Sequence, residues 1–307
     1  MTTLSSSIST PASGEFSPRV YLELAKARLC ALVLVTTAIG FLLAPLAQFD
    51  LMRFAWTLIG VTLAAFGANA LNQCVEISRD ARMPRTARRP LPSRQLTPAA
   101  AWSFAICCAT VGPLVLWLTI GVLPAALALA TVLLYIVIYT PMKSLTPLNT
   151  LVGAICGAIP PMIGWVAATG DLSAPAWILG AILFLWQMPH FFALAWMYRE
   201  DYRLGGFRML PYCDPGGRLT TIMIIAYSLA LAPVSLATVA VGVNGPLYAL
   251  GATALGVWFS SLGWRMRRDR SNAAARRVFI ASVIYLPALL GLMLADHHLT
   301  PIVVAWF

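Results

Sequence analysis

The apolar residues of this chain come in long runs that short polar segments separate. Nine runs of about 20 residues lie near 28–48, 54–77, 99–118, 121–140, 148–168, 174–197, 220–241, 246–264 and 278–296. A helix of about 20 apolar residues spans the roughly 30 Å hydrocarbon core of a bilayer. The alternation of apolar and polar residues that is typical of barrel strands is absent. The pattern therefore predicts nine transmembrane helices.

The N-terminal segment differs from the rest of the chain. It is rich in Ser, Thr and Pro, and it contains no apolar run long enough for a signal peptide. We expect residues 1–18 to form a disordered tail and residues 19–307 to form one nine-helix membrane domain.

Composition excludes several protein classes. Of the 307 residues, 60% are hydrophobic and 10% are charged, and the mean hydropathy is +0.80. A soluble domain carries about 25% charged residues, so this chain has too few charges to cover a water-facing surface. That excludes a soluble globular protein, a disordered chain and, despite a net charge of +10, a nucleic-acid binder. The six cysteines form no CxxC pair, and we interpret them as small core residues.

The basic residues test the number of spans. If the N-terminus is cytoplasmic, nine spans place 20 of the 21 Lys and Arg residues on the cytoplasmic side and leave only Arg53 outside. Cytoplasmic loops of membrane proteins carry an excess of Lys and Arg. The distribution therefore favours an all-α polytopic membrane protein with nine spans in the lipid bilayer and a cytoplasmic N-terminus.

A row of polar residues ends the second span. Asn72, Glu76 and Asp80 are spaced four residues apart, which places them on one face of a helix. Such oxygen ligands suit Mg²⁺, and Arg85 and Arg89 just beyond them can fork onto phosphate oxygens. A helix end with solvated charges is the alternative, but polar groups that begin inside an apolar span are costly and favour a function.

A second polar cluster follows four spans later. It contains His190 inside the span and Tyr198, Arg199 and Asp201 at the helix end. A lone His near an apolar face is more often a hydrogen-bonded core residue than a ligand. Two acidic helix ends with adjacent arginines on one membrane face nevertheless predict a metal and diphosphate site that is open to a lipid-borne tail.

Two further features lie between these clusters. Lys143, in the short segment Tyr139-Thr-Pro-Met-Lys143, is either a topogenic charge or a phosphate contact from the opposite wall. Gly153 and Gly157 have the GxxxG spacing that permits close helix packing.

On these motifs the chain resembles the UbiA-type intramembrane prenyltransferases, and within them the branch that modifies heme. The resemblance covers nearly the whole chain after the tail. Its most specific segments are Asn72-xxx-Glu76-xxx-Asp80, Arg85-Thr-Ala-Arg-Arg89-Pro-Leu, Tyr139-Thr-Pro-Met-Lys143, Pro160-Pro-Met-Ile-Gly164-Trp165, Trp186-Gln-Met-Pro-His190-Phe, and Arg199-Glu-Asp201-Tyr202.

The resemblance implies nine helices around a central cavity, with farnesyl diphosphate as donor and heme b as acceptor. The product would be a hydroxyethylfarnesyl heme for respiratory oxidases, and a downstream heme A synthase or oxidase assembly factors would be further partners. Heme would be a substrate, and Mg²⁺ the cofactor. The location implied is the bacterial inner membrane, with the active site on the cytoplasmic side.

The resemblance also implies roles for individual residues. Mg²⁺ would be held by Asn72, Glu76, Asp80 and Asp201. The diphosphate would contact Arg85, Arg89, Lys143 and Arg199, and the heme would contact His190. Two positions depart from the wider family: Tyr198 and Tyr202 stand where many members have a second DxxxD, and Glu76 stands where many have Asp.

Two other functions stay open. One is a prenyltransferase that acts on a quinone-precursor ring, and the His190 motif and the missing second DxxxD argue against it. The other is a transporter or pore. Against that class, the charged residues cluster at cytoplasmic helix ends, and the span centres offer no chain of ionisable groups.

Overall fold

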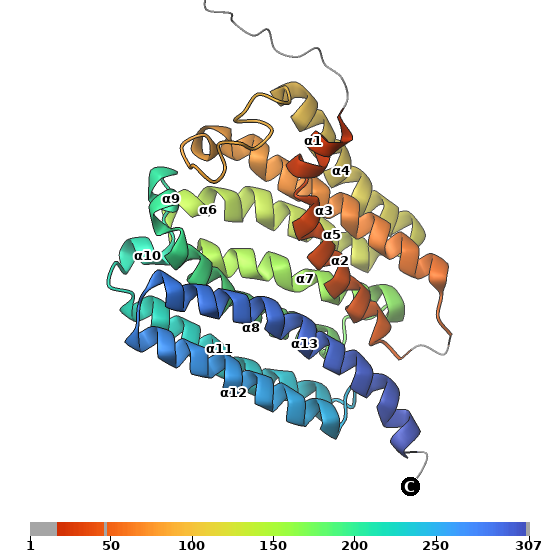
Figure 1. The fold of residues 1–307 in the computed structure, drawn as a ribbon. Coiled ribbons are helices and arrows are strands. Elements are labelled where there is room, and N and C mark those ends of the chain that lie inside the picture. Colours follow the sequence, from red (N-terminus) through yellow and green to blue (C-terminus); the bar gives the residue numbers. More distant parts are fainter. Residues whose placement is uncertain (1–16, 46–47, 305–307) are drawn as a thin grey trace, which may run out of the picture.

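The computed structural model describes residues 17–45 and 48–304, and within these ranges every regular element is a helix. Figure 1 shows long helices that lie side by side in one bundle. The predicted tail lies outside the described residues except for its last two positions, and Pro18 already begins the first helix.

The chain passes through the bundle in sequence order. The first half contains α1 (Pro18–Leu24), α2 (Ala27–Leu42), α3 (Leu51–Asp80), α4 (Pro98–Thr119), α5 (Val122–Leu133), the π-helical segment η1 (Leu134–Tyr139), α6 (Thr140–Leu145) and α7 (Asn149–Thr169). The second half contains α8 (Ala174–Met197), α9 (Arg199–Leu204), α10 (Leu210–Cys213), α11 (Arg218–Ala240), α12 (Pro246–Arg268) and α13 (Asn272–Val304). The helix pattern predicted from the apolar runs is confirmed, since each run overlaps one of these elements.

The number of membrane spans is confirmed only in part. Seven helices of the described residues are long and apolar enough to cross a membrane, or eight if the bent pair of α1 and α2 is one span. The two halves of that pair meet at an angle of 64°. The helix missing from this set is α12, which carries Ser260 and Ser261 and ends in Arg265, Arg267 and Arg268.

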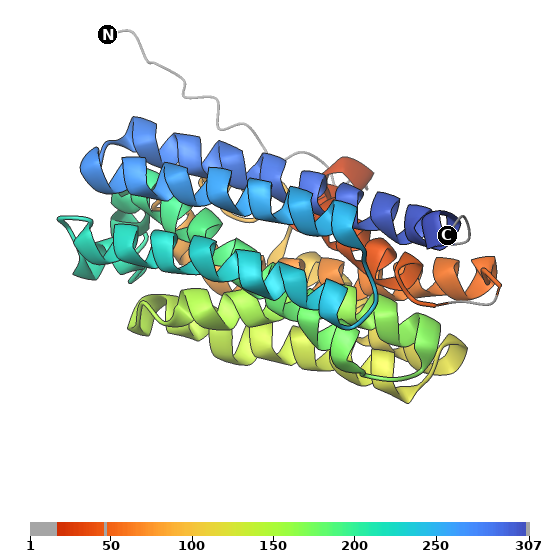
Figure 2. The ribbon, with the colours of Figure 1, turned by 90° about the horizontal axis from the view of Figure 1, so that it is seen from below.

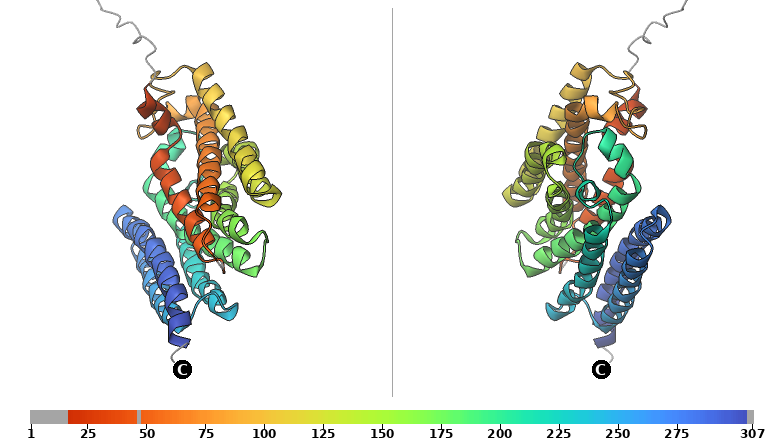
Figure 3. Two further views of the ribbon diagram at one scale, coloured as in Figure 1. Left: turned by 90° about the vertical axis from the view of Figure 1, so that its right-hand side faces the viewer. Right: turned by 90° about the vertical axis from the view of Figure 1, so that its left-hand side faces the viewer.

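The helices form two flanks around a middle layer. The main neighbours along the bundle are α3 and α4, α2 and α7, α7 and α8, α8 with α11 and α13, and α12 with α11 and α13. Figure 3 shows α4 and α5 on one flank and α12 and α13 on the other, and Figure 2 shows the long helices with their axes roughly aligned. One hydrophobic core is centred on α3–α5 and a second on α8–α13, and α7 contributes to both, through Ile159 to the first and Trp165 to the second.

Small residues allow the middle helices to approach closely. A Cβ added to Gly164 on α7 would overlap the carbonyl oxygen of Thr37 on α2. The predicted GxxxG pair also lies at contacts, because a Cβ on Gly153 would meet the Tyr139 ring and one on Gly157 would meet the Gln187 amide. Close packing of small residues is the main source of helix association in lipid, where apolar burial gives little.

The loops that carry most of the basic residues gather at one end of the bundle, on the left in Figure 1. The segment after α3, the end of α6, helices α9 and α10, and the turn between α12 and α13 all lie there. The bundle therefore has one strongly basic end, and the site described next lies at it.

Candidate functional site

Three buried oxygen-bearing side chains line the last turns of α3. Asn72, Glu76 and Asp80 are 0%, 2% and 1% exposed, and we refer to them as the oxygen row. Their spacing along one helical face is the geometry that the sequence predicted. Ionisable groups are rarely buried this completely unless they are paired.

Each member of the oxygen row is paired with a cation. The Lys26 Nζ donates to Asn72 Oδ1 at 3.3 Å. The Lys143 Nζ lies 3.0 Å from Glu76 Oε1, and the Arg89 guanidinium lies 2.6 Å from Asp80 Oδ2. The structure thus brings together five of the residues that the sequence predicted for a metal and diphosphate site, and it adds Lys26 to them.

The three cations come from separate segments. Arg89 lies in the loop that turns back after α3, and Lys143 lies on α6 directly after the π-helical η1. The side chain of Thr140 joins this segment to the row, because it accepts from Asn72 Nδ2 at 3.1 Å and donates to the Tyr135 carbonyl at 2.7 Å. π-helical turns are rare and are frequent at functional sites.

Lys26 is the residue that the sequence prediction missed. It lies at the break between α1 and α2, where its backbone has a φ of 51°, a left-handed conformation unusual for a residue with a side chain. Left-handed residues other than Gly are costly and cluster at functional sites. From the sequence alone, Lys26 was counted only as a cytoplasmic charge.

A basic cavity of about 750 Å³ lies beside the row. Its walls come from α1, the start of α2 and the loop after α3, and they include Lys26, Arg28, Arg85, Arg88 and Arg89. Guanidinium groups fork onto phosphate oxygens. The cavity therefore has the size and the charge for a diphosphate group.

Arg85 connects the two polar clusters of the sequence. Its guanidinium lies over the rings of Tyr198 and Tyr202, at 5.1 and 5.7 Å from their centroids. Burial raises the pKa of the Tyr202 phenol, against the opposing effect of the Arg85 charge, so that this phenol stays protonated at neutral pH. Asp201 lies beside Tyr202 in the first turn of α9.

The metal site is supported by one buried atom. Asp80 Oδ1 has no hydrogen-bond partner among the described residues, although Oδ2 of the same carboxylate is paired. Within 17–45 and 48–304, no three His, Cys, Asp or Glu side chains gather closely enough to form a metal site by themselves. Mg²⁺ commonly uses one or two carboxylates and completes its shell with substrate phosphates and water. The oxygen row fits a Mg²⁺ site that substrate phosphates and water complete.

Arg199 points elsewhere. It was expected beside the diphosphate, but its guanidinium donates to the Trp196 carbonyl at 2.8 Å and to Asn272 Oδ1 at 2.6 Å. It also lies over the Trp196 ring. These contacts fix the end of α8 to the start of α13, so Arg199 is not part of the site proposed below.

His190 lies among aromatic rings between α8 and α13. Its ring stacks on Trp186 and lies 4.7 Å from the Phe279 ring. Its Nδ1 lies 2.8 Å from Ser282 Oγ, and that hydroxyl donates to the Phe279 carbonyl at 2.6 Å. Because the hydroxyl has one proton, the Nδ1 of His190 must be the donor to Ser282, and a neutral ring then has its lone pair on Nε2.

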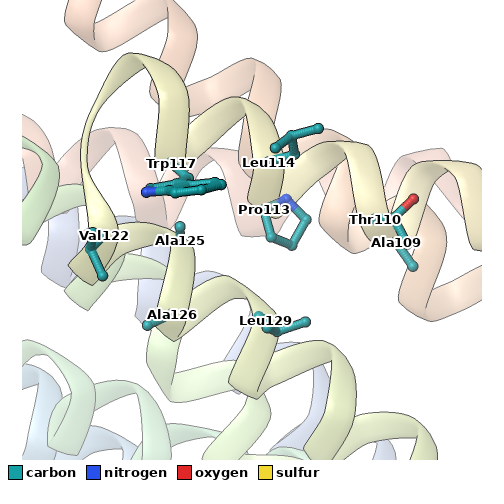
Figure 4. Close-up of a pocket in the computed structure, with 9 residues that line it drawn as sticks. All are labelled: Ala109, Thr110, Pro113, Leu114, Trp117, Val122, Ala125, Ala126 and Leu129. Carbon is teal, nitrogen blue, oxygen red and sulfur yellow. The ribbon is translucent and has the colours of Figure 1, made fainter.

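A further groove, between α4 and α5, differs in character. Figure 4 shows Pro113, Leu114, Trp117, Val122 and Leu129 along its walls, and its volume is about 450 Å³. The one hydroxyl in its lining, on Thr110, is already bonded to the Ile106 carbonyl. A groove without charged groups has no means of binding a diphosphate.

Comparison with known proteins agrees with the geometry. The model of the UbiA prenyltransferase family matches residues 33–283. The protoheme IX farnesyltransferase of Solibacter usitatus (strain Ellin6076) is 46% identical over 288 residues, which are 91% of this chain and 99% of that protein.

Two solved structures are similar in fold. A digeranylgeranylglyceryl phosphate synthase superposes with a TM-score of 0.77 at 17% identity, over 91% of this chain and 98% of that one. A UbiA homolog from Archaeoglobus fulgidus, bound to GPP and Mg²⁺, superposes with a TM-score of 0.66 at 13% identity, over 89% and 99% of the two chains. From the family match, the extent of identity to the farnesyltransferase relative and the shared helical fold, we conclude that this chain belongs to the UbiA prenyltransferase family.

Proposed function

We propose that this chain transfers the farnesyl group of farnesyl diphosphate to a vinyl group of heme b, with addition of water, to give heme O and diphosphate. The observation that carries the proposal is the buried oxygen row, in which each member is paired with a cation at the basic end of an apolar bundle. The name of the Solibacter usitatus relative supports the choice of heme as acceptor.

The donor would bind with its diphosphate in the basic cavity and its tail among the helices. Lys26, Arg85, Arg89 and Lys143 would contact the phosphate oxygens as the allylic C–O bond breaks and negative charge develops on the leaving group. When bound, Mg²⁺ supplies positive charge that stabilises this leaving group. The residues proposed to hold it are Asn72, Glu76, Asp80 and, from α9, Asp201.

The apolar helices would keep water away from the allylic cation before it meets its acceptor. The vinyl group of heme is the nucleophile in this scheme. His190 would ligate or position the heme through Nε2, because Nδ1 already donates to Ser282.

The arrangement in the membrane is also part of the proposal. All nine runs would cross the bilayer, with α2 and α12 as the two that length and apolarity alone do not identify. The basic end would face the cytoplasm, where an excess of Lys and Arg is usual. In a bacterium this membrane would be the inner membrane.

The test is a reaction with purified protein in detergent or lipid, with heme b, farnesyl diphosphate and Mg²⁺, in the presence and absence of chelator. The measurement is the mass of the porphyrin product. We expect a Mg²⁺-dependent gain that corresponds to farnesyl plus water. If the heme mass is unchanged and the prenyl group is transferred to a phenolic acid with release of diphosphate, the acceptor is a quinone-precursor ring and not heme. No diphosphate release with any acceptor would favour a transporter.

Substitutions in the row test the site itself. We expect Asn72→Ala and Asp80→Ala to reduce turnover by at least about a hundredfold, the effect typical of losing one group that stabilises transition-state charge. Arg199→Ala is the matched control, since its guanidinium contacts Trp196 and Asn272 and not the row. Near-normal turnover of either row variant would remove that residue from the metal site.

A further inference from the structure

A small cavity lies between the site and α8. Its volume is about 70 Å³, and its walls include Tyr139, Asn149, Thr150, Phe191, Leu194 and Tyr202. We call it the Asn149 cavity. Polar groups line one side of it, and the space is sufficient for a few water molecules.

Asn149 lines this cavity and carries an unpaired side-chain oxygen. The side chain is 0% exposed, and its Nδ2 donates to the Thr146 carbonyl at 2.6 Å and to the Arg208 carbonyl at 3.1 Å. Because both partners can only accept, the nitrogen and oxygen of the amide are assigned without ambiguity. Asn149 Oδ1 has no hydrogen-bond partner among the described residues. A buried oxygen of this kind is commonly satisfied by water.

The cavity lies between the two groups of residues that the proposed reaction uses. On one side, the Lys143 Nζ lies 4.6 Å from the centroid of the Tyr139 ring, and the same amine pairs with Glu76. On the other side, the Phe191 ring lies 5.4 Å from the His190 ring. The cavity therefore adjoins the Tyr139 and Tyr202 rings that Lys143 and Arg85 contact, and it adjoins Phe191, the chain neighbour of His190.

We infer that the Asn149 cavity holds the water molecule that becomes the hydroxyl of the product. This inference rests on the proposed function and adds to it the origin of that oxygen. A water that donates to Asn149 Oδ1 keeps a lone pair directed away from the amide. The amide therefore binds the nucleophile and orients it.

The chemistry balances with this one water. The vinyl carbon forms a bond to C1 of the farnesyl group as the C–O bond to diphosphate breaks, which leaves a cation on the carbon next to the porphyrin. The water oxygen bonds to that carbon, and its proton passes to the departing diphosphate. Without a water in place, the same cation loses a proton from the adjacent CH₂ to diphosphate and gives an alkene that is one water lighter.

A held water also resolves a conflict in the reaction. Water that reaches the first, allylic cation would give a free prenyl alcohol, whereas the second cation requires water. One molecule bound by Asn149 at a fixed place can serve the second cation while the apolar helices exclude bulk water from the first. The cavity thus determines which product forms more than how fast diphosphate leaves.

The test compares product masses for two variants that act from opposite walls. Asn149→Leu removes the amide, and Leu194→Phe fills the cavity while the hydrogen bonds of Asn149 stay intact. For both we expect the ratio of hydrated to dehydrated farnesyl heme to fall about tenfold. This corresponds to a change of about 1.4 kcal/mol in the difference between the barrier to water capture and the barrier to proton loss. Leu194→Met keeps the volume and is the control, with the wild-type ratio.

The outcomes separate the two proposals. If the wild-type protein gives no farnesylated porphyrin, the proposed function itself is wrong. If the wild type gives the hydrated product and either folded variant keeps the wild-type ratio, the inference about the cavity is overturned. Should Asn149→Leu fail to fold because two carbonyls lose their donor, Leu194→Phe decides alone.

Discussion

Ser282 determines which nitrogen of His190 can bind a metal. Its hydroxyl is committed to the Phe279 carbonyl, so it can only accept from the imidazole. The proton is therefore held on Nδ1, and the ring is fixed by Trp186 on one side and Phe279 on the other. Hydrogen bonds of this kind orient histidine ligands in metal sites and raise their basicity.

We therefore expect Ser282→Ala to weaken the binding of ferric heme by about tenfold to a hundredfold, the range seen when such a partner is lost. The visible spectrum should shift toward that of His190→Ala, whereas Ser282→Thr, which keeps the hydroxyl, should restore both. Heme titration followed by absorbance is the measurement. Ser261→Ala is the control, because the Ser261 hydroxyl on α12 bonds to the Trp258 carbonyl of its own helix.

Wild-type affinity and spectrum in Ser282→Ala would contradict this role. Loss of heme binding in His190→Ala together with no change in Ser282→Ala would leave His190 as a ligand without the positioning partner. Unchanged heme binding in both variants would show that His190 is a hydrogen-bonded core residue and not a heme ligand.

Individual residues of the site differ in how far the sequence predicts them. The oxygen row follows from a spacing of four residues within one helix. Its partners do not, because Lys26 is 46 residues from Asn72, Thr140 is 68 residues from it, and Ser282 is 92 residues from His190. Contacts of that kind are set by helix packing and leave no periodic signal in the sequence.

At the scale of helices, the apolar runs predict most elements but not their local irregularities. The run near 121–140 becomes α5, η1 and the start of α6. The Thr140 side chain donates to the carbonyl of Tyr135, five residues earlier, and so pairs one carbonyl of the wider turn. The break at Lys26 is a second irregularity that hydrophobicity does not reveal, since it depends on one backbone conformation.

The close approach of α2 and α7 leads to a prediction about stability. Gly164→Ala would place a methyl group against the Thr37 carbonyl, which is backbone and cannot move without shifting α2. We expect a loss of about 1–3 kcal/mol, the usual cost of overpacking, seen as a lower thermal midpoint in detergent. Gly291→Ala on α13 is the matched control, because a Cβ there meets nothing within 4 Å. An equal midpoint for both variants would contradict the close contact.

At the scale of the whole molecule, the positive residues predict an orientation that the bundle alone does not fix. Cys213, an exposed residue of α10, lies at the basic end. A membrane-impermeant maleimide should therefore label Cys213 in inverted vesicles and not in intact spheroplasts. Asp171→Cys, in the turn between α7 and α8, should show the opposite pattern. Cys213→Ser is the control for labelling at other cysteines. Labelling of Cys213 in intact spheroplasts would contradict the predicted orientation and indicate the reverse one.

Length and apolar composition do not identify every helix of the bundle as a membrane span. α12 is a full-length helix of the bundle, yet its serines, glycines and terminal arginines lower its apolar character. α2 is only 16 residues long and continues across a bend into α1. Both helices pack against neighbours, so their polar groups meet protein as well as lipid.

The ion pairs of the oxygen row have a consequence for which ions the site can bind. The two ion pairs, Glu76 with Lys143 and Asp80 with Arg89, sum to zero charge at the end of an apolar bundle. A divalent cation alone would add positive charge beside Lys26 and the arginines of the basic cavity. A metal ion that binds together with a prenyl diphosphate would bring most of the opposing charge with it, and the carboxylates could then pair with the metal and the cations with the phosphates. If the site binds Mg²⁺ and diphosphate as proposed, we therefore expect it to favour the metal–diphosphate complex over the metal ion alone.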